Sequence, residues 1–304
     1  MGSRWMIASS VALAACGRIG FDARSDGGDG GGPPADACGF GPWSQRVMLN
    51  ELSSGFEEYT PTVSRDGRTV VFASDRSGGL GGYDLWMATR PVGATSFDLP
   101  THLDPISSSG DDMGPSLSED GLTLYFESNG GGPRELYVAQ RATTSDRFLS
   151  ATLVAGPFET FLETGGPEIS RDGLTLYFDA RGGGGLGGFD IWSVQRASST
   201  SAWDQLTHVT ALNTTSNDLD AALDHDELTL YLTSNRVEVP NDLFVTTRPD
   251  RAVAFAGPTI SPFAGVGIGE YGADISHDGT TMILSVHEPA STLSNLWMST
   301  RACQ

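Results

Sequence analysis

Short runs of β-branched and aromatic residues recur along the chain, each just after an acidic turn sequence. Asp-Gly pairs begin at Asp66, Asp120, Asp172 and Asp278, and Asp226 stands where a fifth is due, at intervals of 54, 52, 54 and 52 residues. The runs that follow read RTVVF, LTLYF, LTLYF, LTLYL and TTMIL. Such residues favour strands, and no long stretch repeats apolar residues at helical spacing. The pattern therefore predicts an all-β chain with five copies of one unit.

Each copy predicts four antiparallel strands. The segment before the aspartate is the first strand, Asp-Gly forms the turn because glycine tolerates positive φ, and the apolar run is the second strand. The third strands read YDLWMATR, RELYVAQR, FDIWSVQR, NDLFVTTR and SNLWMSTR. Fourth strands begin at the aromatic residues that follow: Phe97, Phe148, Trp203 and Phe255. A four-stranded unit of about 50 residues in tandem predicts the blades of a β-propeller.

The two ends of the repeat array are complementary. The fifth copy stops after its third strand, at Arg301, whereas a spare strand, WSQRVML, precedes the first copy. Its Trp43 matches the aromatic residue that opens the fourth strand elsewhere. We therefore expect a single five-bladed propeller over residues 38–304, closed by the N-terminal strand. Cys38 and Cys303 lie just outside these ends, and we expect a disulfide between them, with two free thiols as the alternative.

Two glycine-rich stretches, RSGGLGGYDLW and RGGGGLGGFDIW, fall between the second and third strands. A phosphate-binding loop would precede a helix and supply a lysine, but all 18 basic residues are arginine. We therefore interpret these stretches as wide hairpins. In the fourth copy Glu227 replaces the turn glycine, so we expect that blade to turn differently.

The phrases SRDG, TLYF and GGFDIW resemble the TolB-like, WD-like propeller repeat of bacterial envelope proteins. The resemblance extends over residues 43–301. It implies the propeller fold, but that family includes binding proteins, peptidase propellers and uncharacterised lipoproteins, so it does not select one function.

The first residues form a separate unit. Residues 1–15 carry one charge and a short apolar run, and the box from Leu13 to Cys16 resembles a bacterial lipoprotein signal with Cys16 as the lipidated residue. The alternative is an ordinary signal peptide with an incidental cysteine. Residues 16–37 are rich in Gly, Asp and Pro and predict a flexible tether. Gly17 resembles the outer-membrane sorting pattern, so we expect an outer-membrane lipoprotein facing the periplasm or the cell surface, with this lipid as its membrane contact.

The formal charge of −20 limits the partners. Such acidity argues against nucleic acid, because the chain could not neutralise a row of phosphates. Cations, basic proteins and neutral glycans remain compatible with it.

Five acids precede the turn aspartates at near-constant spacing, eight residues before or, in the third copy, nine. They are Glu58, Asp112, Glu163, Asp218 and Glu270. The first strand of each propeller blade lines the central channel, so these carboxylates would surround one mouth of it. One interpretation is that each caps its own loop. The other is that they bind a basic group of a partner or Ca²⁺, since oxygen ligands favour calcium. We expect no other cofactor.

The leading hypothesis is a monomeric, lipid-anchored binding module that recognises an envelope protein, peptide or glycan at this acidic mouth. The alternative is a glycan-active enzyme, a glycosidase or lyase, which would need carboxylates about 5–9.5 Å apart. Repetition of the acid in all five copies favours a scaffold over a specialised pair. The sequence contains neither H-E-x-x-H nor G-x-S-x-G, and we assign no catalytic residue.

The lipid anchor predicts the behaviour of one variant. Replacing the lipidated cysteine, Cys16→Ser, should release the protein from membranes or leave it unprocessed, because the thiol that receives the lipid is gone. Membrane fractionation and the size of the precursor report this. Unchanged retention together with unchanged processing would contradict the anchor.

Overall fold

A computed structural model describes residues 39–237, 241–264, 268–289 and 291–302. The chain divides into two units, residues 1–33 and 34–304, and every described residue belongs to the second. The expectations for the signal peptide, the tether, Cys16, Cys38 and Cys303 lie outside the described residues. Within the described part, no helix is long and apolar enough to cross a membrane.

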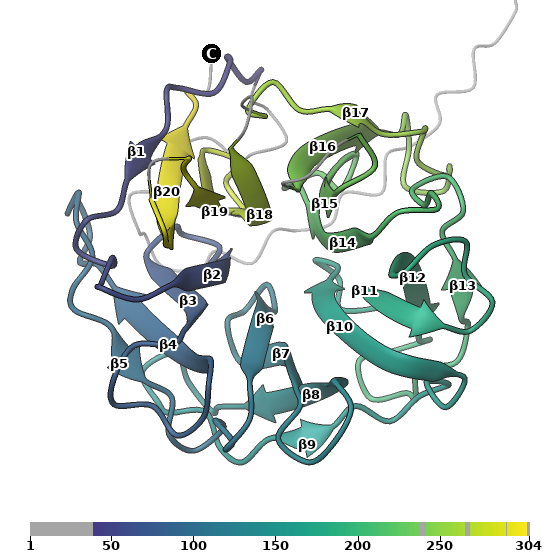
Figure 1. The fold of residues 1–304 in the computed structure, drawn as a ribbon, viewed down its shortest axis with the longest axis horizontal. Coiled ribbons are helices and arrows are strands. Elements are labelled where there is room, and N and C mark those ends of the chain that lie inside the picture. Colours follow the sequence, from purple (N-terminus) through teal and green to yellow (C-terminus); the bar gives the residue numbers. More distant parts are fainter. Residues whose placement is uncertain (1–38, 238–240, 265–267, 290, 303–304) are drawn as a thin grey trace, which may run out of the picture. The chain divides into compact units, whose positions relative to one another are not determined.

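The described chain forms five four-stranded antiparallel sheets arranged around a central axis (Figure 1). Blade 1 contains β2 (Glu58–Val63), β3 (Thr69–Ser74), β4 (Asp84–Thr89) and β5 (Thr101–His102). Blade 2 contains β6 (Asp112–Leu117), β7 (Thr123–Ser128), β8 (Glu135–Gln140) and β9 (Thr152–Leu153). Blade 3 contains β10 (Phe161–Ile169), β11 (Thr175–Gly182), β12 (Asp190–Gln195) and β13 (Thr207–His208). Blade 4 contains β14 (Asp218–Leu223), β15 (Thr229–Ser234), β16 (Asp242–Thr247) and β17 (Thr259–Ile260). Blade 5 contains β18 (Gly269–Ile275), β19 (Thr281–His287), β20 (Ser294–Thr300) and β1 (Val47–Met48). The predicted five-bladed propeller is therefore confirmed.

An arginine after the third strand holds each blade together. In blade 1 the Arg90 Nε–H donates to the carbonyl of the turn residue Gly67 at 2.8 Å, and its guanidinium lies 4.7 Å from the Phe97 ring centre. The equivalent pairs in the other blades are Arg141 with Phe148, Arg196 with Trp203, Arg248 with Phe255, and Arg301 with Trp43. The repeat thus conserves one unit, in which a cation joins the Asp-Gly turn to the aromatic residue before the outer strand. In each blade only two residues of the outer strand are paired, and the first of them lies four residues after the aromatic residue.

The N-terminal strand closes the ring as predicted. Val47 is paired with Met298 and Met48 with Trp297, so β1 lies antiparallel to β20. Trp43 lies 4.3 Å from the Arg301 guanidinium and so takes the place that Phe97 has in blade 1. The last blade is therefore assembled from both ends of the described chain.

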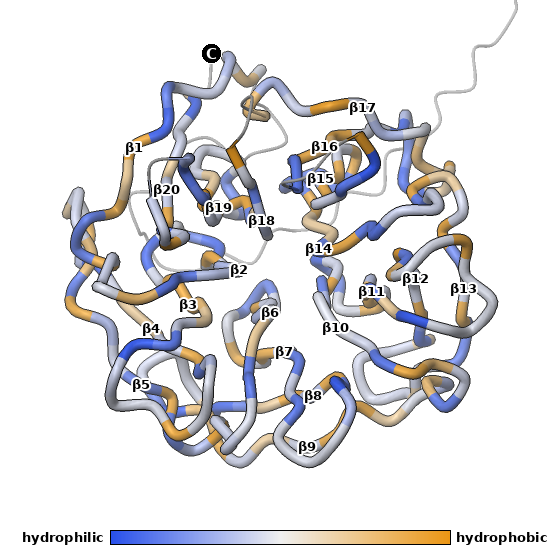
Figure 2. Tube along the Cα trace, viewed as in Figure 1, coloured by the Kyte–Doolittle hydropathy of each residue, from blue (hydrophilic) through white to orange (hydrophobic). Residues whose placement is uncertain are grey.

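The apolar core is divided among the five blade junctions. Each hydrophobic cluster combines residues of two adjacent blades, as where Phe72 of blade 1 packs with Leu296 of blade 5. Figure 2 shows hydrophobic segments in every blade around the ring. Since a propeller sheet covers both of its faces with neighbouring sheets, its middle strands read as nearly continuous apolar runs.

The prediction that blade 4 turns differently at Glu227 is wrong. Glu227 has φ 57° where Gly67 has φ 66°, and its N–H donates to the Asp224 carbonyl at 2.7 Å, as in the glycine turns. A left-handed conformation costs a non-glycine residue about 1 kcal/mol. The Glu227 carboxylate offsets this by accepting the Arg171 N–H at 2.6 Å and lying 3.4 Å from Arg251.

The closed blade leads to a prediction about the two terminal cysteines. The Gly41 N–H donates to the Ala302 carbonyl at 3.0 Å, so the segments that lead to Cys38 and Cys303 run side by side. We expect the oxidised protein to contain this disulfide, which mass spectrometry of a non-reduced digest would identify. Recovery of both peptides as alkylated free thiols would disprove it.

Candidate functional site

The five inner strands β2, β6, β10, β14 and β18 surround the axis (Figure 1), and the level at which their backbones come closest is called the waist here. One residue in each has a positive φ between 41° and 56°: Thr60, Gly114, Gly166, Asp220 and Gly272. At the same place the pairing of each inner strand shifts register. A Cβ on Gly272 would lie 2.9 Å from Thr60 Cα, so the backbones nearly touch. A cavity of about 30 Å³ remains there, which is room for about one water molecule.

On one side of the waist, two predicted acids are buried and paired with arginines. Glu58 accepts hydrogen bonds from Ser54 Oγ at 2.5 Å and from Arg76 at 2.9 Å. Asp218 accepts the Thr214 N–H at 2.6 Å and a bond from Arg236 at 2.5 Å. Neither side chain is exposed to solvent. Burial raises the pKa of Glu58, and the hydrogen bond from Ser54 and the charge of Arg76 oppose that rise.

Two further acids take the same place in blades 2 and 5. Asp112 accepts the Ser108 N–H at 2.6 Å and Ser108 Oγ at 3.1 Å, and burial raises its pKa. Glu270 lies 2.9 Å from Arg46. The Asp112 contacts hold the loop that leads into β6, as the loop-capping interpretation describes, whereas Arg46 joins Glu270 to the N-terminal segment that closes blade 5.

Blade 3 differs because it carries one extra residue. The Thr164 N–H donates to the Arg134 carbonyl at 2.8 Å, as the Asp112 N–H donates to Tyr83 at 2.7 Å. Thr164 is thus the residue at the position of the buried acids, whereas Glu163 is 30% exposed and pairs with Arg181 at 3.1 Å. Among the described residues, no three His, Cys, Asp or Glu side chains are grouped to hold a metal ion. Calcium binding stays an untested hypothesis.

On the other side of the waist lies the Asp-Gly mouth, which we define by the five residues that directly precede the turn aspartates. They are Arg65, Glu119, Arg171, His225 and His277, and they line a cavity of about 70 Å³. The repeat pattern alone does not single out these residues as a site. Their signal is that this one position of the S-x-D-G phrase varies in charge while the positions beside it stay nearly constant.

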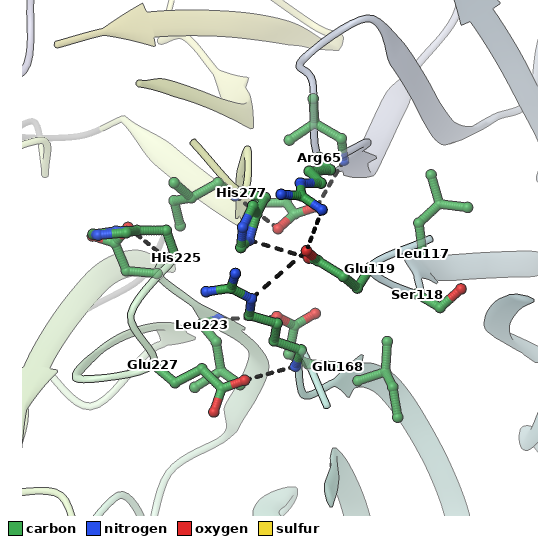
Figure 3. Close-up of a pocket in the computed structure, with 15 residues that line it drawn as sticks. Arg65, Leu117, Ser118, Glu119, Glu168, Leu223, His225, Glu227 and His277 are labelled. Carbon is green, nitrogen blue, oxygen red and sulfur yellow. Dashed lines mark hydrogen bonds and ion pairs between the residues drawn. The ribbon is translucent and has the colours of Figure 1, made fainter. Parts of the chain in front are cut away.

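Glu119 is held by three side chains across this mouth (Figure 3). Its carboxylate lies 3.2 Å from Arg65, 3.6 Å from Arg171 and 3.1 Å from His277 Nδ1. Burial raises the pKa of Glu119, and the two arginines oppose that rise. Burial and the same arginines lower the pKa of His277 to about 4, so the imidazole is neutral at pH 7. The mouth therefore holds one carboxylate between two permanent cations from the blades on either side.

Two more carboxylates form the floor of this cavity. Glu168 accepts the Leu223 N–H at 3.0 Å and Ser116 Oγ at 2.9 Å, both from neighbouring blades. Asp274 accepts Thr62 Oγ1 and the Val63 N–H, each at 2.7 Å. Desolvation raises the pKa of Asp274 to about 6 and that of Glu168 well above its ordinary range. Both groups bridge adjacent blades.

A further cluster lies beside the waist around Arg134. The guanidinium lies 3.1 Å from Glu127 and 3.2 Å from Asp179, and Glu127 also accepts the Gly166 N–H at 2.8 Å. Burial raises the pKa of Asp179 to about 8, which Arg134 opposes and the charges of Glu127 and Asp220 reinforce. One arginine thus faces several carboxylates, so a proton remains bound in the cluster near neutral pH.

Comparison with known proteins finds solved structures with a similar fold. No protein-family model and no curated protein matches the chain. Among solved structures, TolB from Acinetobacter baumannii aligns over 83% of this chain and 56% of its own, with 14% identity and a TM-score of 0.51. The family 117 glycoside hydrolase Zg3597 from Zobellia galactanivorans aligns over 88% and 92%, with 10% identity and a TM-score of 0.58. An α-L-arabinofuranosidase from Lactobacillus brevis aligns over 84% and 94%, with 14% identity and a TM-score of 0.55. The chain thus spans just over half of that TolB, and at these identities the likeness establishes the propeller fold.

The raised pKa of Asp179 predicts a pH dependence of stability. A carboxyl whose pKa rises from about 4 to about 8 on folding binds more proton when folded, so its stabilisation is lost as pH rises through that window. His277 acts in the opposite direction, but only between about pH 4 and 6.5. The melting temperature should therefore fall from pH 6.5 to 8, and Asp179→Asn should reduce that fall. Glu163→Gln, at a partly exposed acid that pairs with Arg181, serves as the control, and an equal fall in all three proteins would contradict the assignment.

Proposed function

We propose that this chain is a non-enzymatic binding module of the bacterial envelope, anchored through Cys16, that takes an acidic group of a protein or peptide at the Asp-Gly mouth. The observation that carries the proposal is the Glu119 carboxylate between Arg65 and Arg171. Arginine binds carboxylates through directed, charge-assisted hydrogen bonds. A partner carboxylate that replaces Glu119 would find its cations already in place.

The size and charge of the mouth limit what enters it. Pockets that enclose small molecules have volumes of about 300 Å³ or more, whereas this cavity has about 70 Å³. It has room for a single side chain or chain terminus, which fits a macromolecular ligand. The net charge of −20 repels strongly acidic partners, so the carboxylate should project from an otherwise neutral or basic surface.

The enzyme alternative would use Glu168 and Asp274. Their raised pKa values suit acid–base chemistry, and solved propellers of similar fold include glycoside hydrolases. However, both carboxylates already accept backbone N–H groups and hydroxyls that join the blades. A sugar that recruited them would have to break buried bonds between blades, whereas a partner carboxylate would displace Glu119 only from partly exposed ion pairs, so the geometry favours binding.

Site-specific photo-crosslinking tests the proposal in cells that produce the chain naturally. A photoreactive benzoylphenylalanine in place of Asp66, which is exposed next to Arg65, leaves both arginines in place and should give a discrete adduct with a partner protein. The same residue in place of Val92, which is 81% exposed in blade 1, serves as the control. Arg171→Glu should reduce the adduct at position 66 at least about tenfold, since a charged contact of this kind contributes ~1.5–3 kcal/mol.

Two results would contradict it. One is an adduct pattern at position 66 that matches the Val92 control. The other is hydrolysis of an arabinan or xylan by the purified chain that Glu168→Gln abolishes, which would support the glycan-active alternative.

A further inference from the structure

A second hollow lies at the junction of blades 2 and 3, where β10 begins. Its volume is about 570 Å³, within the range of pockets that bind ligands. Because β10 starts at this hollow and ends at the Asp-Gly mouth, the two sites lie at opposite ends of one inner strand. We call it the blade 2–3 hollow and define it by Leu136, Leu153, Val154, Phe158, Leu162 and Glu163.

The hollow exists because a turn found at the other junctions does not form here. After the outer strand, those junctions close a turn in which an N–H donates to the carbonyl three residues earlier. The bonds are Leu52 to Leu49, Ile106 to Leu103, Leu212 to Val209 and Ala264 to Ser261, at 2.9 to 3.0 Å. At this junction the donor position, three residues after Val154, is Pro157, which has no N–H.

The chain takes another course after the proline. The Phe158 N–H donates to the Gly156 carbonyl at 2.9 Å, and the Phe158 and Phe161 rings pack against Phe178 with centres 5.3 and 5.6 Å away. The segment is thereby drawn toward blade 3. The space that a turn fills at the other junctions is left open.

The walls of the hollow are apolar and its rim is acidic. Leu136 and Val154 are buried in its floor, whereas Leu153 and Leu162 at the rim are 51% and 64% exposed. Exposed aliphatic side chains around a hollow mark a place where a partner can bury apolar surface.

The charges at the rim determine which charge the partner should carry. Glu135 and Glu159 are exposed there. Arg134 also lines the hollow, but its guanidinium is bonded to Glu127 and Asp179. The rim therefore offers carboxylates, and the charge of −20 on the whole chain adds to their attraction for a cation.

We infer that the blade 2–3 hollow docks a segment of a partner protein that presents an aliphatic or aromatic side chain next to a lysine or arginine. The apolar side chain enters between Leu153 and Leu162, and the cation faces Glu135 and Glu159. The inference does not depend on the Asp-Gly mouth, whose proposed ligand has the opposite charge.

Fluorescence anisotropy with the full chain tests it. The probe is the labelled peptide Gly-Lys-Leu-Phe-Lys-Gly, and two matched peptides replace either both lysines by glutamate or Leu-Phe by Ser-Ser. The first should bind and the other two should bind at least about tenfold more weakly, because each loses one half of the contact. Arg171→Glu should leave this binding unchanged, which separates the result from a failure at the Asp-Gly mouth.

Variants of the chain locate the binding. Leu162→Asp should weaken the peptide at least about tenfold, whereas Leu99→Asp, at an 81% exposed leucine of blade 1, should not. Because both leucines are exposed, the melting temperatures should match that of the parent chain. Three results would overturn the inference. They are equal binding of all three peptides, no binding of the cationic peptide, and full affinity of that peptide for Leu162→Asp. Displacement of an equally bound peptide by a neutral oligosaccharide would instead assign the hollow to a glycan.

Discussion

The ring is held at its axis by hydrogen bonds that pass from each blade to the next. A side chain four residues before the turn aspartate accepts a backbone N–H from the neighbouring inner strand. The bonds are Leu117 to Thr62, Ile169 to Ser116, Leu223 to Glu168 and Val63 to Asp274, at 2.7 to 3.2 Å. At the remaining junction Ala222 has no acceptor, and the Ile275 N–H bonds to Asp274 of its own strand. Since these bonds are shielded from bulk water, an unpaired N–H would be costly. This explains why two carboxylates with raised pKa values lie in the channel of a protein that we propose to be non-catalytic.

The repeat made the fold predictable, since five copies in register fixed the strand order, the turns and the closure through Trp43. The candidate site was less predictable, because equal spacing does not reveal where a side chain points. Glu163 lies nine residues before its turn aspartate, yet the extra residue in blade 3 puts Thr164 at the buried position and leaves Glu163 partly exposed beside Arg181. The charged residues of the Asp-Gly mouth can be read from the sequence. That they contact Glu119 depends on how closely the five blades approach the axis, which the sequence does not show. The hollow was hidden for another reason, since the effect of Pro157 appears only when its junction is compared with the others.

The departures from fivefold symmetry have a common physical meaning. Positions that are equivalent in all blades carry the turn, the arginine and the aromatic ring, which form the same local contacts five times. A partner that binds the ring in a single orientation requires positions at which the side chains differ among the blades. The mouth with Arg65, Glu119 and Arg171, and the junction with Pro157, provide such differences at the two ends of β10. The waist between them leaves space for about one water, so the two surfaces can be occupied by unrelated ligands.

Closure by β1 also determines the order in which the domain can form. β1 emerges first from any machinery that delivers the chain from its N-terminus, yet its partner β20 lies about 250 residues later. Blades 1 to 4 are each contiguous in sequence and can pair locally, whereas blade 5 must wait for the last residues. Until then the apolar faces at both ends of the array remain uncovered. Blade 5 therefore cannot be completed before these two distant segments meet, and a truncated chain lacking β20 would be left with an open ring.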